Sequence, residues 1–495
     1  MNLGTEPPDL DPAKVTDLNS FTVLQNIMRG LTTFGDNGKV VPAIAARWDI
    51  SKNGRRITFH LRPDALWSDG KPVTASDFLF SWKRALDPRR AAPYAFFLFD
   101  IEGAEDYFKG KPVPLGIRVL DERTLEVSLR RSIPFFLDLM ASPVALPLRP
   151  ENIRHTDDAF TEEAQWIVNG PFQIKAWRHD ERLSLVPNLR YYGFSQKKPG
   201  LDRIDMLMIG DSNTSVVMYE NNDLDYIETT SSIPSFDVRR LRKLPEARVQ
   251  TLHRIDYLGF NTKKPPFNDV NVRRAFAMSL DRTYYPRLLQ SGQKPIASWI
   301  SPGMPGYNPA IGIAYQPQKA KIIIQNWQQK HTKMLEPISL GYQTGYDIQK
   351  QVEIAQFLWK QNLKLPVHLE NMEWKVYLRR LSDDPPSIFR LGWYVDYPDP
   401  DSYLSLFTTG NGNNYTGWHH PDYDRWVKEA AVTLDPARRK SLMDKAQRLL
   451  LEQDVVIVPL FVSEKTYLVK PWVHGFSVNA MNLIQLERLQ VDPHA

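Results

Sequence analysis

The chain has 495 residues, of which 42% are hydrophobic and 24% are charged, a composition that excludes a disordered protein and is typical of a globular one with about three domains. Its 62 Lys and Arg residues against 57 Asp and Glu residues leave a formal net charge of +5, so we expect no nucleic-acid partner. Cysteine is absent, which excludes a cysteine nucleophile, thiolate metal sites and disulfides, and no apolar run approaches the roughly 20 residues that a membrane-spanning helix needs.

Alternating segments predict strands in the first half of the chain. Apolar and polar side chains alternate along residues 56–62, 124–130 and 182–185. Between the first two of these segments, Thr74 followed by Asp77 has the pattern of a helix cap, and Phe78 and Trp82 follow at helical spacing. We therefore predict an α+β organisation for about the first 150 residues.

Helices and strands follow one another in the second half. Helices are predicted over residues 270–280, after Asn268-Asp269, and from Asp435-Pro436 onward, where a capping residue precedes a proline. Strands are predicted at residues 338–340, 367–369 and 455–458. This succession is typical of an α/β lobe, so the chain is predicted to have two unlike lobes. The extended segments 254–261 and 458–462 are the candidates for a hinge between them.

The motifs of common enzyme classes do not occur. The sequence has no glycine-rich dinucleotide or phosphate loop, no G-x-S-x-G elbow and no H-E-x-x-H pair. Its ten histidines are scattered apart from His419 and His420, and adjacent residues on a strand point to opposite faces. We therefore predict no catalytic residue, no metal site and no cofactor.

One acidic cluster contains Asp396, Asp399 and Asp401. Asp399 and Asp401 lie between prolines, where we expect a solvated turn. Asp396 directly follows the aromatic strand 391–395, and a carboxylate beside apolar surface needs a partner. That partner is either an internal Arg or backbone amide, or a cationic group on a ligand. A pair of carboxylates for glycoside hydrolysis is the remaining alternative.

Several runs carry a resemblance to a known family. They are residues 41–48 (VPAIAARW), 58–62 (TFHLR), 65–78 (ALWSDGKPVTASDF), 168–172 (VNGPF), 266–275 (PFNDVNVRRA), 372–375 (MEWK) and 468–472 (LVKPW). Together they resemble the periplasmic oligopeptide-binding proteins, the family 5 solute-binding receptors of peptide ABC transporters. The resemblance spans nearly the whole chain, and the run that ends at Phe78 is its most specific part.

The resemblance implies an α/β and α+β fold with two lobes of the periplasmic binding protein type (type II, with an extra subdomain), which close on a ligand about a hinge of two extended segments. It places the main part of lobe I at residues 1–28, 154–256 and 463–495, the extra subdomain at 29–153, and lobe II at 257–462. No signal peptide is visible after Met1. We therefore expect a periplasmic or extracytoplasmic protein whose leader has been cleaved.

The resemblance also implies ligand-binding residues. Asp396 matches the family's carboxylate for the ligand's N-terminal ammonium, and Tyr94 matches a hydroxyl that helps to hold this end. Gly392 and Tyr394 match positions whose main chain pairs with an extended ligand. Arg390 matches a basic residue that reaches toward the carboxyl end of short peptides.

Two aromatic residues complete the implied site, and three departures change it. Trp393 and Trp374 match walls of side-chain pockets. Relatives that take long peptides carry an acidic residue near Gly259 and histidines near Gln349 and Ser382, and this chain has none of them. The amine clamp is therefore expected to be kept, while the side-chain pockets and the carboxyl-end clamp are expected to differ.

We predict a non-enzymatic receptor that binds peptides between its lobes and delivers them to the permease of an ABC transporter and its ATPase. It is expected to act as a monomer and to bind ligands mainly through their main chain. The same fold with a murein peptide, another amine or a non-peptide solute as ligand is the alternative, because fold does not fix function. A hydrolase that uses Asp396, Asp399 or Asp401 is the third hypothesis.

Overall fold

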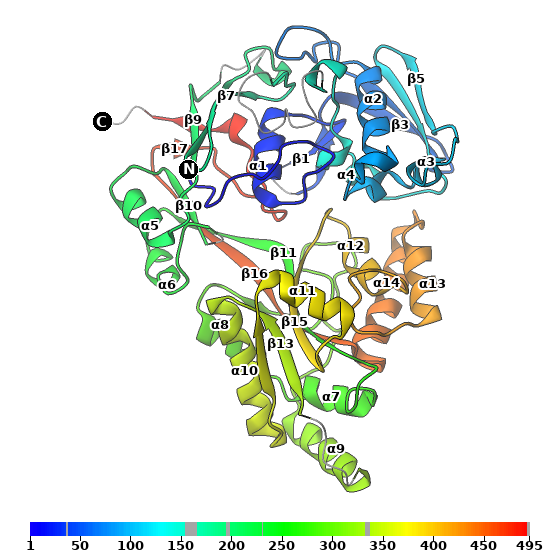
Figure 1. The fold of residues 1–495 in the computed structure, drawn as a ribbon, viewed down its shortest axis with the longest axis vertical. Helices are drawn as coiled ribbons and strands as arrows, with labels where there is room; N and C mark the ends of the chain where they lie inside the picture. Colours follow the sequence, from blue (N-terminus) through cyan, green and yellow to red (C-terminus); the bar gives the residue numbers. More distant parts are fainter. Residues whose placement is uncertain (36–37, 154–165, 195–198, 230, 332–336, 493–495) are drawn as a thin grey trace. The chain divides into compact units, whose positions relative to one another are not determined.

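The computed structural model describes residues 1–35, 38–153, 166–194, 199–229, 231–331 and 337–492. The chain divides into two compact units (Figure 1): unit 1 is Met1–Gln250 with Thr466–Ala495, and unit 2 is Thr251–Lys465. It passes from one unit to the other inside strands β11 (Ala247–Phe260) and β16 (Ile457–Val469). These two strands overlap the extended segments that the sequence predicts as connections.

The predicted lobe boundaries at residues 256 and 462 lie a few residues from the unit boundaries at Gln250 and Lys465. The predicted end of the extra subdomain, at residue 153, adjoins residues 154–165, which lie outside the described part of the chain. The division of lobe I into two parts therefore stays a prediction.

Unit 1 is built from small antiparallel sheets. Its four-stranded sheet has the order β3 (Ala45–Ile50), β4 (Arg56–Leu61), β6 (Thr124–Ser128) and β5 (Ile117–Asp121). A three-stranded sheet consists of β7 (Phe172–Arg178), β8 (Arg182–Pro187) and β9 (Ile204–Leu207). The pairs are β1 (Thr32–Phe34) with β2 (Val40–Pro42), β17 (Val473–His474) with β18 (Gln490–Val491), and β10 (Tyr226–Glu228) with the end of β16. The three strands predicted for this part of the sequence are confirmed as β4, β6 and β8.

The helices of unit 1 are α1 (Leu18–Ile27), α2 (Ala75–Ala85), α3 (Ala104–Phe108), α4 (Phe136–Leu139), α5 (Ser212–Glu220) and α6 (Val238–Leu241). Helix α2 begins where the sequence predicts. The backbone N–H of Thr74 donates to Asp77 Oδ2 at 2.8 Å, and Trp67 Nε1 donates to the same oxygen at 3.1 Å. Phe78 and Trp82 are buried on the inner face of the helix. The capping pattern and the apolar stripe thus fix both the start and the orientation of α2.

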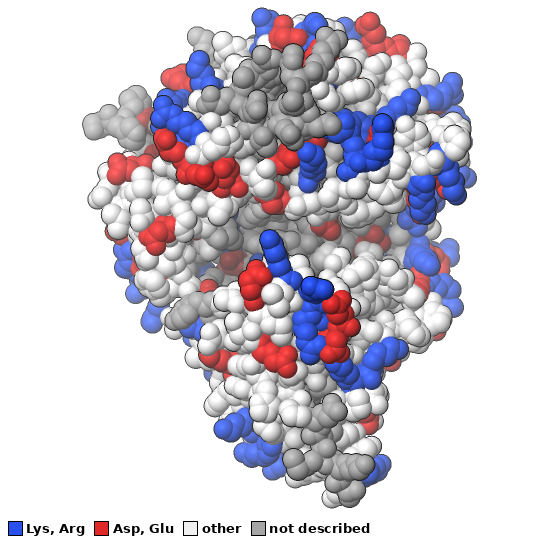
Figure 2. Space-filling view, in the orientation of Figure 1, with Lys and Arg blue, Asp and Glu red and all other residues white. Residues whose placement is uncertain are grey.

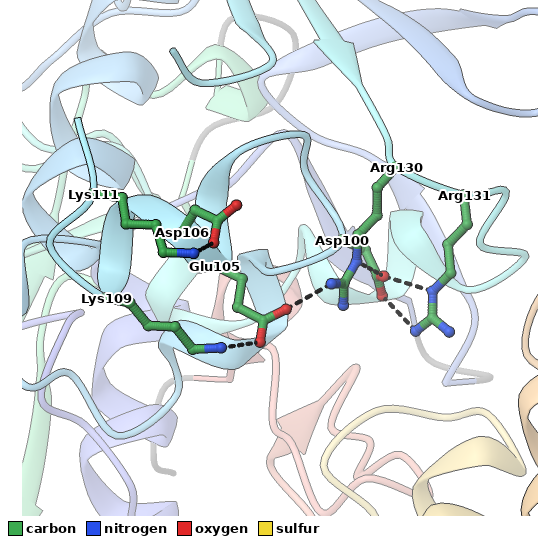
Figure 3. A network of polar contacts seen from close by, with 7 residues as sticks. All are labelled: Asp100, Glu105, Asp106, Lys109, Lys111, Arg130 and Arg131. Carbon is green, nitrogen blue, oxygen red and sulfur yellow. Dashed lines mark hydrogen bonds and ion pairs between the residues drawn. The ribbon is translucent and has the colours of Figure 1, made fainter. Parts of the chain in front are cut away.

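A polar network joins the segment after the short 3₁₀ helix η2 (Ala95–Leu98) to neighbouring elements (Figure 3). Asp100 accepts hydrogen bonds from Arg130 Nε at 3.0 Å and from Arg131 Nε at 2.7 Å. Arg130 Nη1 also donates to Glu105 Oε2 on α3 at 2.6 Å. The residues that follow β6 are therefore joined through side chains to Asp100, which follows η2, and to α3.

Unit 2 is organised around one mixed sheet. The sheet order is β16, β11, β15 (Ile388–Tyr394), β13 (Ser339–Gln343) and β14 (His368–Met372), and β12 (Lys294–Pro295) pairs with β16. Strand β15 runs antiparallel to β11 and parallel to β13. At Ile388 and Phe389, β15 therefore has a neighbouring strand on each side, whereas its later residues pair with β11 alone.

The helices of unit 2 are α7 (Val270–Met278), α8 (Tyr284–Leu289), α9 (Pro317–Lys330), α10 (Tyr346–Leu363), α11 (Trp374–Asp383), α12 (Asp401–Leu404), α13 (Pro421–Ala430) and α14 (Pro436–Arg448). Asp269 caps α7 and Asp435 caps α14, so both predicted helix starts are confirmed. An aromatic cluster forms part of the core: Phe267 and Phe276 lie 4.9 Å apart edge to face, and Phe276 lies 5.1 Å from Trp359. These residues belong to the core that packs α7 and α10 against the sheet.

Charged side chains of both signs are interspersed on the face drawn in Figure 2. Many charged side chains of the described residues form ion pairs; in unit 1, for example, Arg240 pairs with Glu220 and Asp237. Of the helices in the described residues, none combines the length and the apolar character that crossing a membrane requires.

Candidate functional site

Six of the seven site residues predicted from the sequence lie in unit 2, on or near β15. Arg390, Gly392, Trp393 and Tyr394 belong to this strand, Asp396 follows it, and Trp374 begins α11. Tyr94 lies in unit 1. The fold of unit 2 thus brings together residues that the sequence places in two separate segments.

The hydrogen-bond pattern of β15 shows which main-chain groups face away from β11. The N–H of Val395 donates to the carbonyl of His253 at 3.1 Å. In an antiparallel pair, alternate residues direct both their N–H and C=O to the partner strand. Trp393 therefore faces β11 with its main chain, whereas Gly392 and Tyr394 direct theirs to the opposite edge.

That opposite edge is open beside Gly392 and Tyr394. The register of β15 with β13 ends at Phe389, so no strand of the described residues runs beside this part of β15. The hydroxyl of Tyr377 lies 2.9 Å from both the Gly341 and the Arg390 carbonyl oxygens and donates its proton between them. The open edge therefore starts after Arg390, at the two positions predicted to pair with a ligand.

Gly392 is required by close packing on one face of the strand. A Cβ at this position would lie 2.8 Å from Arg254 Nη2 and 2.8 Å from Asp256 Oδ1. In the β11–β15 register Asp256 is opposite Gly392, and Arg254 is opposite Tyr394. The absence of a side chain at Gly392 is what lets these two charged groups lie above the main chain of β15.

Arg390 points into unit 2. Its side chain is 2% exposed, its Nη2 donates to Asp256 Oδ1, and its Nε donates to Gln351 Oε1 at 2.9 Å. The sequence predicts that this guanidinium reaches toward the carboxyl end of a ligand. In the structure Asp256 binds it instead, so that contact would require the guanidinium to leave a buried ion pair.

Asp256 is the centre of a polar cluster that the sequence-based prediction missed. Besides Arg390 it binds Arg254, whose Nε and Nη2 each lie 3.1 Å from a carboxylate oxygen, and it accepts a hydrogen bond from Ser463 Oγ at 2.9 Å. Burial raises the pKa of Asp256, but the charges of Arg254 and Arg390 outweigh this effect and hold the pKa below its usual value. The carboxylate is thus ionised although it is buried.

A signal for this cluster was present in the sequence. Arg254 and Asp256 alternate with the apolar Ile255 and Tyr257 in a segment predicted to be a hinge strand. A carboxylate inside such a strand needs a cationic partner. The sequence did not show which Arg supplies it, because Arg390 lies 134 residues away.

Trp393 and Asp396 are held by one residue of α12. Trp393 Nε1 donates to the carbonyl of Ser402 at 2.9 Å, and the backbone N–H of Asp396 donates to Ser402 Oγ at 3.0 Å. Both side chains are half-buried. Ser402 therefore fixes the end of β15 and the direction in which the chain carries Asp396.

The Pro-rich turn differs from the prediction. Asp399 was expected in solvent, but it is buried and binds Arg439 with both oxygens, at 2.8 and 2.7 Å. Asp401 accepts a hydrogen bond from the hydroxyl of Tyr397 at 2.8 Å. The prediction of a solvated turn was wrong because α14 packs against it and supplies the cation.

Trp374 and Tyr94 are the remaining aromatic residues of the predicted site. Trp374 is the first residue of α11 and is 43% exposed, an unusual exposure for an indole that would otherwise be core. Tyr94 precedes η2 in unit 1, and its ring centroid lies 5.0 Å from that of Phe97 and 5.6 Å from that of Phe96. Their roles at a ligand stay predictions.

No group of three or more His, Asp or Glu side chains in the described residues is arranged to hold a metal ion. The polar groups near β15 are instead an open strand edge, a half-buried carboxylate and a buried cluster with two guanidiniums. These groups can bind a main chain and charged ends. They do not form a nucleophile with an adjacent base.

Comparisons with known proteins identify the family of the chain. A model of the family described as bacterial extracellular solute-binding proteins, family 5 (middle region), matches residues 39–415. The dipeptide-binding protein DppE of Bacillus subtilis is 31% identical over 498 residues, which cover 98% of this chain and 90% of that protein.

Solved structures match nearly the whole chain, and two of them illustrate the similarity. The structure of the Escherichia coli murein tripeptide binding protein MppA has a TM-score of 0.83 and 28% identity, covering 100% of this chain and 98% of that one. The crystal structure of Haemophilus influenzae OppA in complex with the peptide RPPGFSPFR has a TM-score of 0.80 and 30% identity, covering 99% of this chain and 98% of that one.

Proposed function

The chain belongs to family 5 of the bacterial extracellular solute-binding proteins, and from this premise we propose that it is a receptor that binds peptides and delivers them to an ABC transporter. Its two-lobed periplasmic binding protein fold, predicted from the sequence, is confirmed by the similarity to MppA and OppA. The name of DppE and the peptide in the OppA complex support a peptide as the class of ligand.

The observation that carries the proposal is the open edge of β15 at Gly392 and Tyr394. A strand edge with unpaired N–H and C=O groups can bind an extended chain of another molecule. A peptide added there would form main-chain hydrogen bonds, which do not depend on its side chains. Sequence-tolerant binding is what a transport receptor for many peptides needs.

Asp396 would supply the second part of the recognition. It follows the open edge by two residues, and Ser402 fixes its main chain. We propose that its carboxylate binds the α-ammonium of a peptide whose main chain pairs with β15. Trp393 and Trp374 would contact ligand side chains, and Tyr94 would contribute from unit 1.

The receptor would perform no chemistry of its own. The hydrolase hypothesis needs two available carboxylates among Asp396, Asp399 and Asp401. However, Asp399 is bound to Arg439 inside unit 2, and Asp401 accepts a hydrogen bond from the Tyr397 hydroxyl. Family membership supports a location outside the cytoplasm, in the periplasm or its equivalent, and a membrane permease with its ATPase as the partner. The protein would act as a monomer that releases its ligand to this permease.

A murein peptide is the second candidate ligand, because the similarity to MppA covers the whole chain. Such a ligand also carries an ammonium group, so Asp396 would serve either class. Native mass spectrometry of the protein as purified separates them, since the mass of a retained ligand identifies an ordinary peptide, a murein peptide or a non-peptide.

The decisive test is Asp396→Asn, measured by isothermal titration with a free-amine tripeptide and its N-acetylated form. Removing one member of a desolvated charge pair costs about 2–5 kcal/mol, so affinity for the free-amine peptide should fall about thirtyfold to several thousandfold. The acetylated peptide should bind the unaltered protein poorly and lose little more. Asp422→Asn is the matched control, because Asp422 pairs with Arg425 on the surface of α13.

Two outcomes would contradict this role. An equal loss for the free and acetylated peptides would make Asp396 a structural residue. Undiminished binding in Asp396→Asn would remove the amine clamp, and a non-peptide ligand would then become the leading candidate.

A further inference from the structure

The cluster around Asp256 contains more positive than negative charge. Its one carboxylate, that of Asp256, binds the two guanidiniums of Arg254 and Arg390. The neutral Ser463 donates a hydrogen bond to Asp256, and the neutral Gln351 accepts one from Arg390. The three charged side chains therefore carry a surplus of one positive charge. A buried or half-buried surplus charge is costly unless a counter-charge joins it.

Of the three charged side chains of the cluster, that of Arg254 is the most exposed. The side chain of Arg390 is 2% exposed and that of Asp256 is 1% exposed, whereas the side chain of Arg254 is 27% exposed. The Arg254 guanidinium also lies over the Tyr394 ring, 4.9 Å from its centre, and this cation–π contact helps to position it. Arg254 is thus the member of the cluster that another molecule could reach.

The distances from Arg254 to the Cβ position of Gly392 show where the guanidinium lies relative to the open edge. Arg254 starts from β11, on the far side of β15 from that edge. Its Nη2 and Nε nevertheless lie 2.8 and 3.0 Å from where a Cβ of Gly392 would be, so the guanidinium lies above the main chain of β15 itself. A chain added to the open edge would run about 4.8 Å away, one strand spacing, from this line.

We infer that Arg254 is the specificity-determining cation of the site, and that it selects ligands with a carboxylate on the residue that pairs beside Gly392. The inference rests on the proposed function, because it takes the ligand to be a peptide on the open edge. The carboxylate is either the C-terminal group of a short peptide or an acidic side chain, since both offer two oxygens to the fork of a guanidinium.

The test uses alanine tripeptides with free amino ends. Trialanine carries a C-terminal carboxylate, and trialanine amide carries none. Amidated peptides with Glu at the first, second or third position carry only a side-chain carboxylate, and their Gln counterparts are neutral and of the same shape. Isothermal titration gives the ratio of affinities within each anionic and neutral pair.

The unaltered protein should prefer the anionic member of at least one pair by about tenfold to a hundredfold, the range for a hydrogen bond to a charged group. Arg254→Gln should reduce this preference to about twofold or less and leave neutral peptides within about twofold of their original affinity. Arg254→Lys keeps the charge, so it should retain part of the preference. Preference for trialanine over its amide would identify the C-terminal group, and preference for one Glu peptide would identify a side chain.

Arg287→Gln is the matched control. Arg287 also lies over a tyrosine ring of unit 2, 5.7 Å from the centre of Tyr284, but on α8 rather than at β15. Its removal should leave every affinity ratio unchanged. Folding of Arg254→Gln is checked by thermal unfolding and is expected to survive, because Asp256 keeps Arg390 as its partner.

Equal affinity of the unaltered protein for the members of every pair would overturn the inference and leave the proposed function standing. An undiminished preference in Arg254→Gln would overturn it too, and would assign the selection to another cation. If no tripeptide of either charge binds at millimolar concentration, the proposed function itself fails for short peptides, and the inference falls with it.

Discussion

Two regions of unit 2 bury an aspartate in different ways. In the Pro-rich turn, Asp399 binds one guanidinium, that of Arg439, and the pair is neutral. In the β11–β15 ladder, Asp256 binds two guanidiniums, and the cluster keeps a positive charge. The charges of Asp399 and Arg439 balance each other within the fold. The Asp256 cluster has a net positive charge that only a further anionic group can balance.

The net charge of each arrangement distinguishes a structural ion pair from a possible ligand-binding group more clearly than the residue types do. Both carboxylates belong to segments with several polar residues, and both are buried. Counting the cations around each one, rather than the acidic residues themselves, indicates where a ligand could contribute. We therefore predict that Asp256 and Asp399 both stabilise the fold. Only charge changes in the Asp256 cluster should alter the preference for anionic over neutral ligands.

The largest expected effect is that of Asp256→Asn on stability. The substitution leaves the buried Arg390 and the half-buried Arg254 without a carboxylate, and breaking a buried ion pair in this way costs about 3–5 kcal/mol. With two cations affected, we expect a loss of about 5 kcal/mol in the free energy of unfolding, measured by urea denaturation followed through tryptophan fluorescence. A loss below about 1 kcal/mol would show that the cluster is solvated in solution.

Asp399→Asn should have a smaller effect, of about 3 kcal/mol, because one cation loses its partner and the Arg439 side chain is 11% exposed. The double variant Asp399→Asn with Arg439→Met removes both charges and should recover part of this loss. Its affinity for every tripeptide should match that of the unaltered protein. A change in the ratio of anionic to neutral peptides would break the comparison, since it would connect the turn to the ligand.

The dependence of stability on pH sharpens the comparison further. The two guanidiniums hold the pKa of Asp256 below its usual value despite burial, so its contribution to stability is complete above about pH 4, the ordinary Asp pKa. The contribution is lost as the pH falls from there through the lower pKa of the folded state, at up to about 1.4 kcal/mol per pH unit. The gap in unfolding free energy between the unaltered protein and Asp256→Asn should therefore narrow below about pH 4. A gap that is constant from pH 6 to pH 3 would contradict the depressed pKa.

The local elements near the site could be predicted from the sequence. The aromatic run before Asp396 predicted a strand, and it is part of β15. Caps at Thr74, Asp269 and Asp435 predicted helix starts, and the structure confirms them. Such features depend on neighbours within a few residues, so the sequence contains them directly.

The ion pairs could not be predicted, because they join distant segments. Asp256 and Arg390 are 134 residues apart, and Asp399 and Arg439 are 40 residues apart. Which Arg meets which Asp depends on the register of β11 with β15 and on the packing of α14. The sequence predicted a partner only for Asp396. It indicated solvent exposure for Asp399 and did not single out Asp256, because the cations that bind these two carboxylates come from distant segments.

Gly392→Ala tests the close packing that the ladder requires. The new methyl group would lie 2.8 Å from atoms of Arg254 and Asp256, so the guanidinium must shift away from β15. Overpacking of this kind costs about 1–3 kcal/mol, and we expect a value near 2 in urea denaturation. The preference for anionic tripeptides should fall as well, because Arg254 would no longer lie above the main chain. Unchanged stability and preference would show that the side chain of Arg254 rests elsewhere in solution.

Tyr377→Phe should have the smallest effect. It distinguishes the contribution of the open edge of β15 to ligand binding from that of the charge of the Asp256 cluster. The hydroxyl of Tyr377 bridges the Gly341 and Arg390 carbonyls where β13 and β15 part. Removing it should cost about 1 kcal/mol of unfolding free energy, the net value of one buried hydrogen bond, as measured by urea denaturation. The Asp256 cluster keeps its charges, so the ratio of affinities for anionic and neutral tripeptides should stay the same. Affinities for both classes should shift together, because the freed Arg390 carbonyl lengthens the open edge that every peptide uses. A change in the ratio alone would mean that Tyr377 acts through the position of Arg390, and the edge and the charge could then no longer be treated as independent parts of the site.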